Sequence, residues 1–337
     1  MGVDVLLIGQ EHTKRSDYFI SAASALGYKV RIVAWDKWQV EDLKDARFVK
    51  LDPATYTEAN ITHLPRIIAE YYEQLNRLQM VSGICFLNHP KALGDTLDKV
   101  NCKRILMQNN IPTTPLWEEK IASYEELKES MLQQKQVAVF IKPRYGSGAA
   151  GVMAYRYHPL TKEEILYTSM RTAGENQLYN TKKMKRITTQ EEIKSLIDGL
   201  FSQEVIIEKW VQKAKYKDLS YDLRVVYQFG NIDFVVARGS QMPITNLHLN
   251  NCALSIEKIG LADKVKDELF QLCEKTMACF KGFNTAGIDV LITPKGKVMV
   301  IEVNGQGDLI YQDIFKENKI YKEQMRGMIS KYGQVTL

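Results

Sequence analysis

The sequence predicts an α/β protein that changes to mixed α+β structure in its C-terminal part. A short apolar run at residues 3–8 is followed by a helical pattern and by a second apolar run at 28–35. This order is that of a βαβ unit, which implies a parallel sheet. From residue 137 onward, apolar runs follow one another with glycine-containing turns between them. Such a pattern is typical of antiparallel hairpins.

The composition fits a soluble globular protein of two or three domains. The 337 residues are 45% hydrophobic and 25% charged, and the net charge of +5 is compatible with an anionic ligand without requiring nucleic acid. The N-terminus lacks a signal-peptide pattern, and no stretch is long enough for a membrane span. Five cysteines without a CxxC pair suit a reducing compartment. We therefore expect a cytoplasmic protein with no membrane partner.

Residues 1–90 are predicted to form a small α/β domain. A strand at 3–8, a helix around 18–26 and a strand at 28–35 make the βαβ unit, and residues 81–90 are predicted to be a later strand of the same sheet, ended by Pro90. The unit has no GxGxxG fingerprint. A structural or substrate-binding lobe is therefore favoured over a dinucleotide-binding domain.

The remainder of the chain predicts helices alternating with hairpins. Helical spacing continues over 92–110 until Asn110 and Pro112 end it. The elements expected beyond it are a strand, glycine loop and strand over 137–157, two strands around Gly174, a helix at 189–200, a strand at 204–211, a hairpin over 220–240 turning at Gly230–Asn231, a helix at 261–280 and a hairpin over 285–305 turning at 294–296.

The last hairpin carries oxygen-bearing side chains on an otherwise aliphatic strand. Glu302 and Asn304 lie two residues apart and therefore point to one face of that strand, and antiparallel pairing can bring Asp289 to the same face. Two carboxylates and an amide oxygen are hard ligands of the kind that Mg²⁺ uses together with substrate phosphates. Taken alone, a solvent-facing Glu302 explains the pattern equally well.

A glycine loop follows the strand that ends near Lys142. Residues 144–151 contain three glycines and two alanines, which let backbone amides approach phosphate oxygens while the lysine supplies a point charge. The loop is not a Walker A motif, because no Gly-Lys-Ser/Thr opens a helix. A flexible hairpin accounts for the loop equally well when it is taken alone.

The hairpin over 220–240 and the loop after it add further polar candidates. Asp222 and Arg224 share one strand face, with an acid suited to a sugar hydroxyl and a cation suited to an anion. Asn246 and His248 follow in a loop, where a lone histidine is more often structural than catalytic. The basic run at 181–186 lacks the interleaved aromatic residues that stacking on bases requires, so a solvated basic edge is favoured and no nucleic-acid partner is expected.

In their order along the chain, these segments resemble the ATP-grasp fold. The segments that carry the resemblance are "IKPRYGSG", "IIEKWV", "YDLRVV", "TNLHLNN", "AGIDVL" and "VIEVNG", and it extends over about residues 95–310. They look most like the branch of the ribosomal-protein glutamate ligase and peptide-modifying ligases, in a bacterial subfamily. The resemblance implies an N-terminal domain at 1–90, a lid subdomain with the glycine loop at 91–205 and a C-terminal subdomain with a magnesium site at 206–337.

The resemblance also implies roles for individual residues. Arg224 and Lys142 match catalytic positions, with Arg224 holding the acyl phosphate, and Lys103 is a weaker candidate than Lys99 for the first phosphate-contacting lysine. The order Glu208–Lys209 departs from the usual hinge, and the segment 152–205 is longer than in the simplest members. The matched nucleotide-contacting positions are Lys99, Lys142, Gly146, Ser147, Gly148, Gly151, Glu208, Lys209, Trp210, Val211, Asp222 and Asn246, and the matched metal ligands are Asp289, Glu302 and Asn304.

The implied function is ATP-dependent ligation of a carboxylate to an amine, with release of ADP and phosphate. ATP and Mg²⁺, or Mn²⁺ in its place, are the implied cofactors, and the substrates are a small molecule or peptide with a carboxylate and an amine acceptor. Asp308 is a candidate to attract or deprotonate the amine, while Tyr311 can equally pack on the C-terminal helix. The alternative is a catalytically silent ATP-binding regulatory or partner protein of the same fold. A homodimer is compatible with either function.

Overall fold

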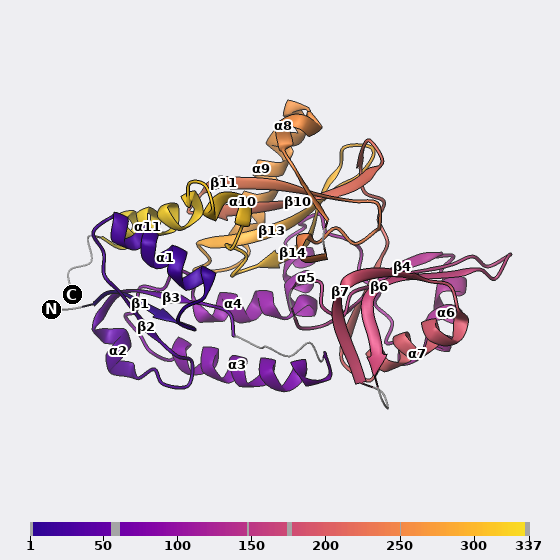
Figure 1. Ribbon diagram of the computed structural model, residues 1–337, viewed down its shortest axis with the longest axis horizontal. Coiled ribbons are helices and arrows are strands. Elements are labelled where there is room, and N and C mark those ends of the chain that lie inside the picture. The colour runs from indigo at the N-terminus through magenta and orange to yellow at the C-terminus, as the bar shows by residue number, and fades with distance from the viewer. Residues whose placement is uncertain (1–2, 55–60, 147, 174–176, 250, 334–337) are drawn as a thin grey trace.

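The computed structural model describes residues 3–54, 61–146, 148–173, 177–249 and 251–333. Within these ranges the chain forms a parallel N-terminal sheet, an antiparallel lid sheet from the middle of the sequence and an antiparallel C-terminal sheet (Figure 1). The lid sheet lies to one side of the other two, and the long C-terminal helix lies next to the first helix of the chain. One parallel sheet followed by two antiparallel sheets confirms the predicted fold class.

The N-terminal sheet contains the predicted βαβ unit. Its order is β2-β1-β3, and the central strand is aliphatic and buried over residues 5–8 because both of its faces are covered there. Val5 and Leu7 pack with the first helix, whereas Leu6 and Ile8 pack with the third. The elements are β1 (Val3–Ile8), α1 (Lys14–Ala25), β2 (Val30–Val33), α2 (Val40–Lys44), β3 (Ala46–Leu51), η1 (Ile61–His63) and α3 (Leu64–Gln79).

The strand predicted at 81–90 is wrong in extent. This segment reaches β3 only at an isolated parallel bridge, where Val49 N donates to Cys85 O at 3.0 Å and Leu87 N donates to Val49 O at 2.8 Å. Asn88 then turns the chain toward the C-terminal sheet, since its Nδ2 donates to Thr285 O at 2.8 Å. Because a helix begins at Pro90, the sheet gains no further strand here.

The helix predicted over 92–110 is two helices, α4 (Pro90–Leu97) and α5 (Lys99–Gln108). They separate at Asp98, which has an extended backbone and caps α5 by accepting hydrogen bonds from Val100 N at 3.0 Å and Asn101 N at 3.2 Å. The same carboxylate forms an ion pair with Arg144 at the start of the glycine loop. The break therefore ties the N-terminus of α5 to that loop.

The lid sheet has one face against helices and one face toward the rest of the protein. Val139 and Ile141 pack with the helices, and the alternating residues Phe140 and Lys142 point to the opposite face. The order is β7-β6-β5-β4-β8. The elements are α6 (Tyr124–Gln133), β4 (Ala138–Pro143), β5 (Met153–Tyr157), β6 (Glu164–Ala173), β7 (Gln177–Ile187), α7 (Gln190–Phe201) and β8 (Val205–Lys209), which confirms the predicted strands and helix.

The C-terminal sheet is arranged by the same alternation. Leu223 and Val225 pack toward α9, whereas Asp222 and Arg224 face the other side. Its order is β12-β11-β10-β13-β14, with β9 paired to β10. The elements are β9 (Lys215–Tyr216), β10 (Leu219–Gln228), β11 (Asn231–Ser240), η2 (Leu247–Leu249), β12 (Cys252–Leu254), α8 (Ile256–Ile259), α9 (Asp263–Ala278), β13 (Thr285–Ile292), β14 (Val298–Asn304), α10 (Tyr311–Ile314) and α11 (Lys319–Tyr332).

The hydrophobic cores follow this arrangement. The N-terminal and C-terminal sheets share cores, since Leu6 lies in one cluster with Val300 and Val5 lies in another with Met325. A further core lies around Tyr155, between the lid sheet and the helices α6 and α7, and Ile61 and Leu64 from the N-terminal part of the chain contribute to it. The division of the chain at residues 90 and 205 stays a prediction. Within the described residues, no helix combines the length and the apolar composition needed to cross a membrane.

Candidate active site

Two cavities lie where the lid and the C-terminal sheet face each other. The central cavity, of about 300 Å³, lies between the loops of the N-terminal sheet and the β10–β14 face, and the lid cavity, of about 100 Å³, lies beneath the lid sheet. Arg238, Asn246 and Glu302 line both. An open groove of about 710 Å³ lies elsewhere, between the β10–β11 turn and α11, and contains none of the predicted site residues. Size alone therefore does not mark the site.

A β-bulge brings the three candidate metal ligands to one face. The register of the β13–β14 pair shifts between Asp289 and Val290, which leaves Ile301 as an extra residue in β14. As a result, Asp289 lies opposite Glu302, and Gly287 lies opposite Asn304. Glu302 and Asn304 line the central cavity, and Asp289 lines the adjoining lid cavity. The expectation that one hairpin can present all three side chains together agrees with this register.

The surroundings of Asp289 suit a cation. Its Oδ2 lies 3.1 Å from Arg238 Nη2. Its Oδ1 lies 2.8 Å from Arg224 Nε, yet it is buried and accepts no hydrogen bond from the described residues. Burial raises the pKa of this carboxyl and nearby Glu302 adds to the rise, while the two arginines oppose it. A buried carboxylate oxygen without a donor, beside a second carboxylate and an amide, fits the donor set that Mg²⁺ prefers.

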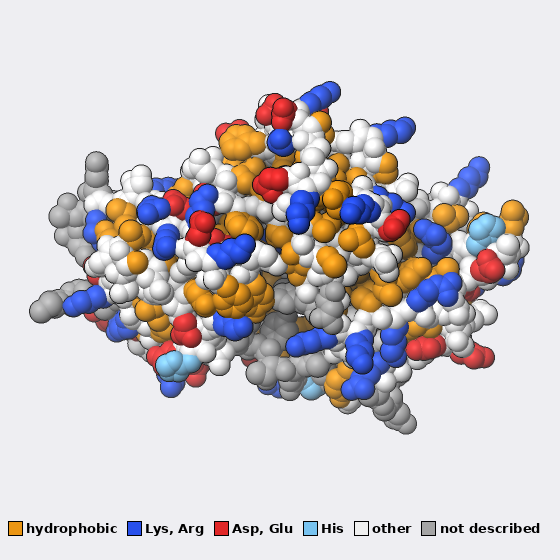
Figure 2. All heavy atoms as spheres, turned by 45° about the horizontal axis from the view of Figure 1, so that its top comes forward, with side chains coloured by type: hydrophobic (Ala, Val, Ile, Leu, Met, Phe, Trp, Pro, Cys, Tyr) orange, Lys and Arg blue, Asp and Glu red, His pale blue; other side chains and the backbone are white. Residues whose placement is uncertain are grey.

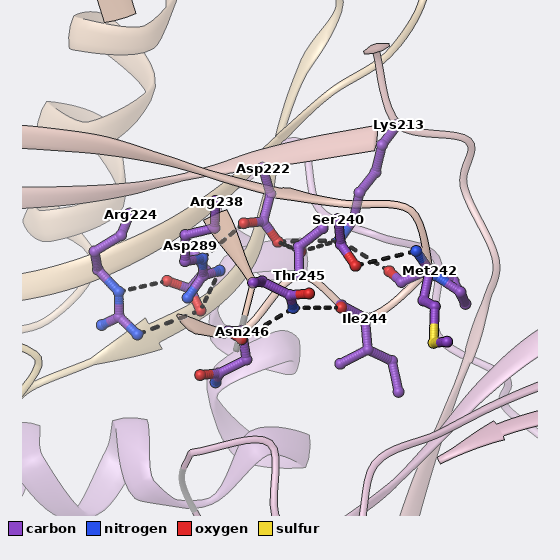
Figure 3. Close-up of polar contacts among 12 residues, drawn as sticks. Lys213, Asp222, Arg224, Arg238, Ser240, Met242, Ile244, Thr245, Asn246 and Asp289 are labelled. Carbon is purple, nitrogen blue, oxygen red and sulfur yellow. Dashed lines mark hydrogen bonds and ion pairs between the residues drawn. The ribbon is translucent and has the colours of Figure 1, made fainter. Parts of the chain in front are cut away.

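Asp222 lies at the centre of a second charged group, on β10 (Figure 3). Its carboxylate accepts from Arg238 Nε at 2.7 Å and from Lys213 Nζ at 3.0 Å, and Thr245 Oγ1 donates to it as well. Although burial raises the pKa of Asp222, Arg238 and Lys213 hold it at about 2. Asp222 is therefore a buried anion that positions two cations on the wall of the lid cavity.

Arg238 is a site residue that the sequence reasoning missed. It is buried on β11 and bridges Asp222 and Asp289, so it connects the candidate nucleotide-contacting acid with the candidate metal ligand. The available signal was an arginine between Ala237 and Gly239, directly after the apolar run at 234–237. Such a residue needs a partner when it is buried, and the partner is given by strand register rather than by sequence spacing.

Lys142 projects from β4 into a buried charged cluster. Its Nζ lies 3.0 Å from Glu208 Oε2, while Lys103 Nζ lies 3.5 Å from Glu208 Oε1. Glu208 is 2% exposed; although burial raises its pKa, Lys103 and Lys142 hold the pKa at about 2. Lys103 also donates to Thr113 Oγ1 at 2.7 Å and to Thr114 O at 3.2 Å, so this weaker candidate is satisfied inside the protein.

Lys99 and the glycine loop meet at the edge of the central cavity. Lys99 is the first residue of α5, and its Nζ donates to Gly146 O at 2.6 Å. Burial lowers the pKa of Lys99. Position 151 requires glycine for two reasons: its φ is +74°, and a Cβ there would lie 2.4 Å from Pro143 Cγ. Gly148 lines the same cavity, whereas Ser147 lies outside the described residues.

The hinge strand β8 brings only part of its predicted set to the lid cavity. Lys209 and Val211 line it together with Glu208, whereas the ring of Trp210 packs on Phe140 at 5.1 Å. The loop after β11 is fixed by Asn251 Nδ2, which donates to Asn246 O at 2.9 Å. The side chain of His248 lies outside what the structure describes.

Asp308 does not have the role that the sequence suggested. Asp308 is 3% exposed and forms an ion pair with Arg15. Lys50 Nζ lies 3.3 Å from its Oδ2, and Gln324 Nε2 donates a hydrogen bond to the same oxygen at 3.0 Å. A carboxylate so enclosed is not available to take a proton from an amine. Tyr311 stacks on Phe315 with ring centroids 5.3 Å apart and also lines the central cavity.

The basic run at 181–186 is on the surface of the lid. Lys182, Lys183, Lys185 and Arg186 are exposed on β7, which is an edge strand of the lid sheet. Figure 2 shows Lys and Arg side chains gathered on the lid side of the molecule. The expectation of a solvated basic edge agrees with this exposure.

The fold of the chain is shared with several solved structures. The structure of D-cycloserine synthetase DcsG matches with a TM-score of 0.64 at 13% identity, covering 97% of this chain and 99% of that one. D-alanine–D-alanine ligase from Bacillus anthracis in complex with ATP matches with a TM-score of 0.60 at 16% identity, covering 99% and 98%. ATP-grasp ligase PsnB with its minimal precursor matches with a TM-score of 0.59 at 11% identity, covering 98% and 100%. At these identities the likeness establishes the fold.

The family follows from the sequence itself. Residues 89–335 match the model of the YheC/D-like ATP-grasp family, and the chain belongs to that family. A search of curated proteins found no match. The predicted ATP-grasp superfamily is confirmed, while the narrower branch of the ribosomal-protein glutamate ligase stays a prediction.

Proposed function

We propose that the protein is an ATP-dependent carboxylate–amine ligase that releases ADP and phosphate. The observation that carries this proposal is that one central cavity is lined both by cations, at Lys99, Arg224 and Arg238, and by oxygen ligands, at Glu302 and Asn304. Cations suit the transferring phosphoryl group, and hard oxygen ligands suit the metal ion that accompanies ATP. The adjoining lid cavity, with apolar residues such as those at 140, 152, 244 and 291, suits a nucleobase.

The proposed reaction has two steps. A carboxylate oxygen of the substrate attacks the γ-phosphorus of ATP, the bond to the β-phosphate oxygen breaks and ADP leaves. The amine nitrogen then attacks the acyl carbon, the bond from that carbon to the phosphate oxygen breaks, and the amine loses a proton as phosphate departs. Lys99 and Lys142 bind phosphate oxygens, and Arg224 holds the acyl phosphate with Arg238 beside it.

Three residues would hold the metal ion. Asp289, Glu302 and Asn304 present two carboxylates and an amide oxygen from paired strands, and Mg²⁺, or Mn²⁺ in its place, supplies charge neutralisation at the β- and γ-phosphates when bound. Asp222 fixes Lys213 and Arg238, and Glu208 fixes Lys142, so the cations are oriented before the nucleotide arrives.

The substrates are proposed as a class. A small molecule or peptide supplies the carboxylate and the amine, as the resemblance to the branch of the ribosomal-protein glutamate ligase implies. We further propose that the protein is cytoplasmic, that it forms a homodimer, and that it has no membrane or nucleic-acid partner.

The test is nucleotide release by the purified protein with Mg·ATP. It is run with and without a small-molecule and peptide extract of the host, and with Glu302→Gln as the inactive comparison. The expected result is extract-dependent ADP and phosphate that Glu302→Gln does not produce. Release of AMP would overturn the acyl-phosphate chemistry, and ATP binding without any turnover would favour the regulatory alternative.

A further inference from the structure

The end of the central cavity next to the N-terminal sheet contains an arginine with unused donors. Arg15 is the second residue of α1, whose first turn is fixed by Thr13, since Ser16 N donates to Thr13 Oγ1 at 3.0 Å. The Arg15 side chain is 15% exposed and lines the cavity. Its Nη1 pairs with Asp308, but its Nε and Nη2 donate to no residue in the described part of the chain. This leaves the side-on edge of the guanidinium, which has the geometry to bind a carboxylate through two hydrogen bonds.

The acid partner of Arg15 is already shared. Asp308 is also approached by Lys50 at 3.3 Å and by Gln324 at 3.0 Å, and Lys50 divides its charge between Asp308 and Asp52. Two carboxylates therefore serve two cations and an amide donor in this cluster. A guanidinium has five N–H donors, so the cluster retains donors for an anion that enters from the cavity.

A hydrogen-bond acceptor, the side-chain oxygen of Gln306, lines the same cavity as Arg15. Gln306 Nε2 donates to Leu51 O at 2.9 Å and to Tyr71 Oη at 2.7 Å, which uses both amide hydrogens and fixes the orientation of the side chain. Gln306 Oε1 receives no hydrogen bond from the described residues and is left to accept one. Apolar side chains, among them Leu93 and Ile310, line the cavity around this pair.

We propose that this end of the cavity binds the amine acceptor as a free amino acid. Its carboxylate binds the Nε–Nη2 edge of Arg15, and its amine donates to Gln306 Oε1. This inference rests on the proposed ligase function and goes beyond it by excluding simple amines and peptide side-chain amines, which lack the adjacent carboxylate. Arg15 is then the residue that determines the acceptor class.

Calorimetry on the wild-type protein tests the ligand without any substitution. The protein is loaded with Mg²⁺ and a non-hydrolysable ATP analogue and titrated with glycine, with the other nineteen L-amino acids and with their D-enantiomers. Each amino acid that binds is then replaced by its carboxamide. The expected result is that at least one amino acid binds and that its carboxamide binds at least tenfold more weakly. Equal binding of acid and amide, or no binding by any amino acid, would overturn the inference.

Matched variants test the residue. Arg15→Gln is expected to weaken the amino acid at least tenfold while the ATP analogue binds as in wild type, and Arg66→Gln, whose side chain is 84% exposed on α3, is expected to change neither. If Arg15→Gln does not fold, Arg15→Gln/Asp308→Asn removes both charges of the pair and takes its place. Unchanged amino-acid affinity in the variant that folds would contradict the role of Arg15. Failure of the ATP analogue itself to bind would instead overturn the proposed function.

Discussion

The two ends of the cleft differ in how their charges are paired. At the lid end, Glu208, Asp222 and Asp289 each lie between two cations. These ion pairs fix the positions of the lysine and arginine side chains before a ligand binds. At the other end, Arg15 has donors that Asp308 does not use, and Gln306 has an acceptor that no described residue uses. In the proposed ligase, this difference teaches that the groups for phosphoryl transfer are held mostly by ion pairs within the protein, with Asp289 Oδ1 left for the metal ion, whereas substrate choice is left to groups that a ligand completes.

The largest effect is expected from breaking a network at the lid end. Glu208→Ala leaves Lys103 and Lys142 buried without their acid, and removing one partner of a buried ion pair costs about 3–5 kcal/mol. Urea denaturation measures the loss. The matched change Glu204→Ala removes an exposed carboxylate that lies 3.2 Å from Arg144 and is expected to cost less than about 1 kcal/mol. Equal losses of unfolding free energy in the two variants would contradict the prediction that the buried Glu208 cluster stabilises the fold more than an exposed ion pair does.

The next effect is on turnover, measured beside the loss of stability that removing Arg224 from its buried pair with Asp289 causes. Glu302→Gln or Arg224→Ala is expected to lower kcat by about 10²–10³-fold, because each removes one fixed charge around the transferring group. The thermal unfolding midpoint of each variant is measured alongside to show that the fold is retained. Glu274→Gln, an exposed change on α9, is the control and should turn over as wild type. Near-wild-type rates in the Glu302 or Arg224 variant would contradict the site.

A smaller effect is expected from pH. The pKa values of Glu208 and Asp222 are held at about 2, below the ordinary values of 4.5 and 3.8. Because the folded state binds these protons more weakly than the unfolded state does, their contribution is fully present above about pH 4.5 and is lost as the pH falls toward 2. The urea midpoint of the wild type should therefore fall between pH 5 and 3 more steeply than that of Glu208→Gln. Parallel curves would refute the assignment for Glu208.

The smallest effect is expected where ion pairs face solvent. Lys194 pairs with Glu125 and, at 3.2 Å, with Asp198 on the outer surface of the lid. Exposed pairs contribute little because water and salt screen them, so Lys194→Ala should leave the urea midpoint unchanged. A clear fall in the midpoint would mean that surface pairs stabilise this protein as much as the buried networks do.

The elements of the site were predictable because their signals are local. Alternation along the strand at 298–304 predicted that Glu302 and Asn304 share a face, and the glycines after Lys142 predicted a loop. In that loop Gly146, Gly148 and Gly151 have positive φ angles. What brings Asp289 opposite Glu302 is the bulge at Ile301. A uniform register counted from the turn would place Asp289 opposite Ile301 and would turn Glu302 to the other face.

A second bulge explains why Arg238 was missed. The turn was predicted at Gly230–Asn231, but its two residues are Phe229 and Gly230, because Asn231 is the first residue of β11. A uniform count from this turn pairs Asp222 with Ala237. The register shift between Val226 and Tyr227 moves the pairing by one residue, to Arg238. A bulge depends on packing against neighbouring strands, which spacing in one sequence does not encode.

The remaining contacts of the site join distant parts of the chain. Glu208 meets Lys103 and Lys142 only after β8 has paired with β4, and Arg15 meets Asp308 only after the N-terminal sheet has packed against the C-terminal one. The role suggested for Asp308 was wrong for this reason, since nothing near it in sequence indicates the cations that enclose it.

Transfer of oxygen from the carboxylate to phosphate tests the central claim most directly. The purified protein is incubated with Mg·ATP and a host extract whose carboxylates have been exchanged with ¹⁸O, and the released phosphate is analysed by mass spectrometry. A ligase that passes through an acyl phosphate predicts ADP together with phosphate that carries one ¹⁸O atom. Unlabelled phosphate, which signals attack by water on ATP, or the appearance of AMP would contradict the account.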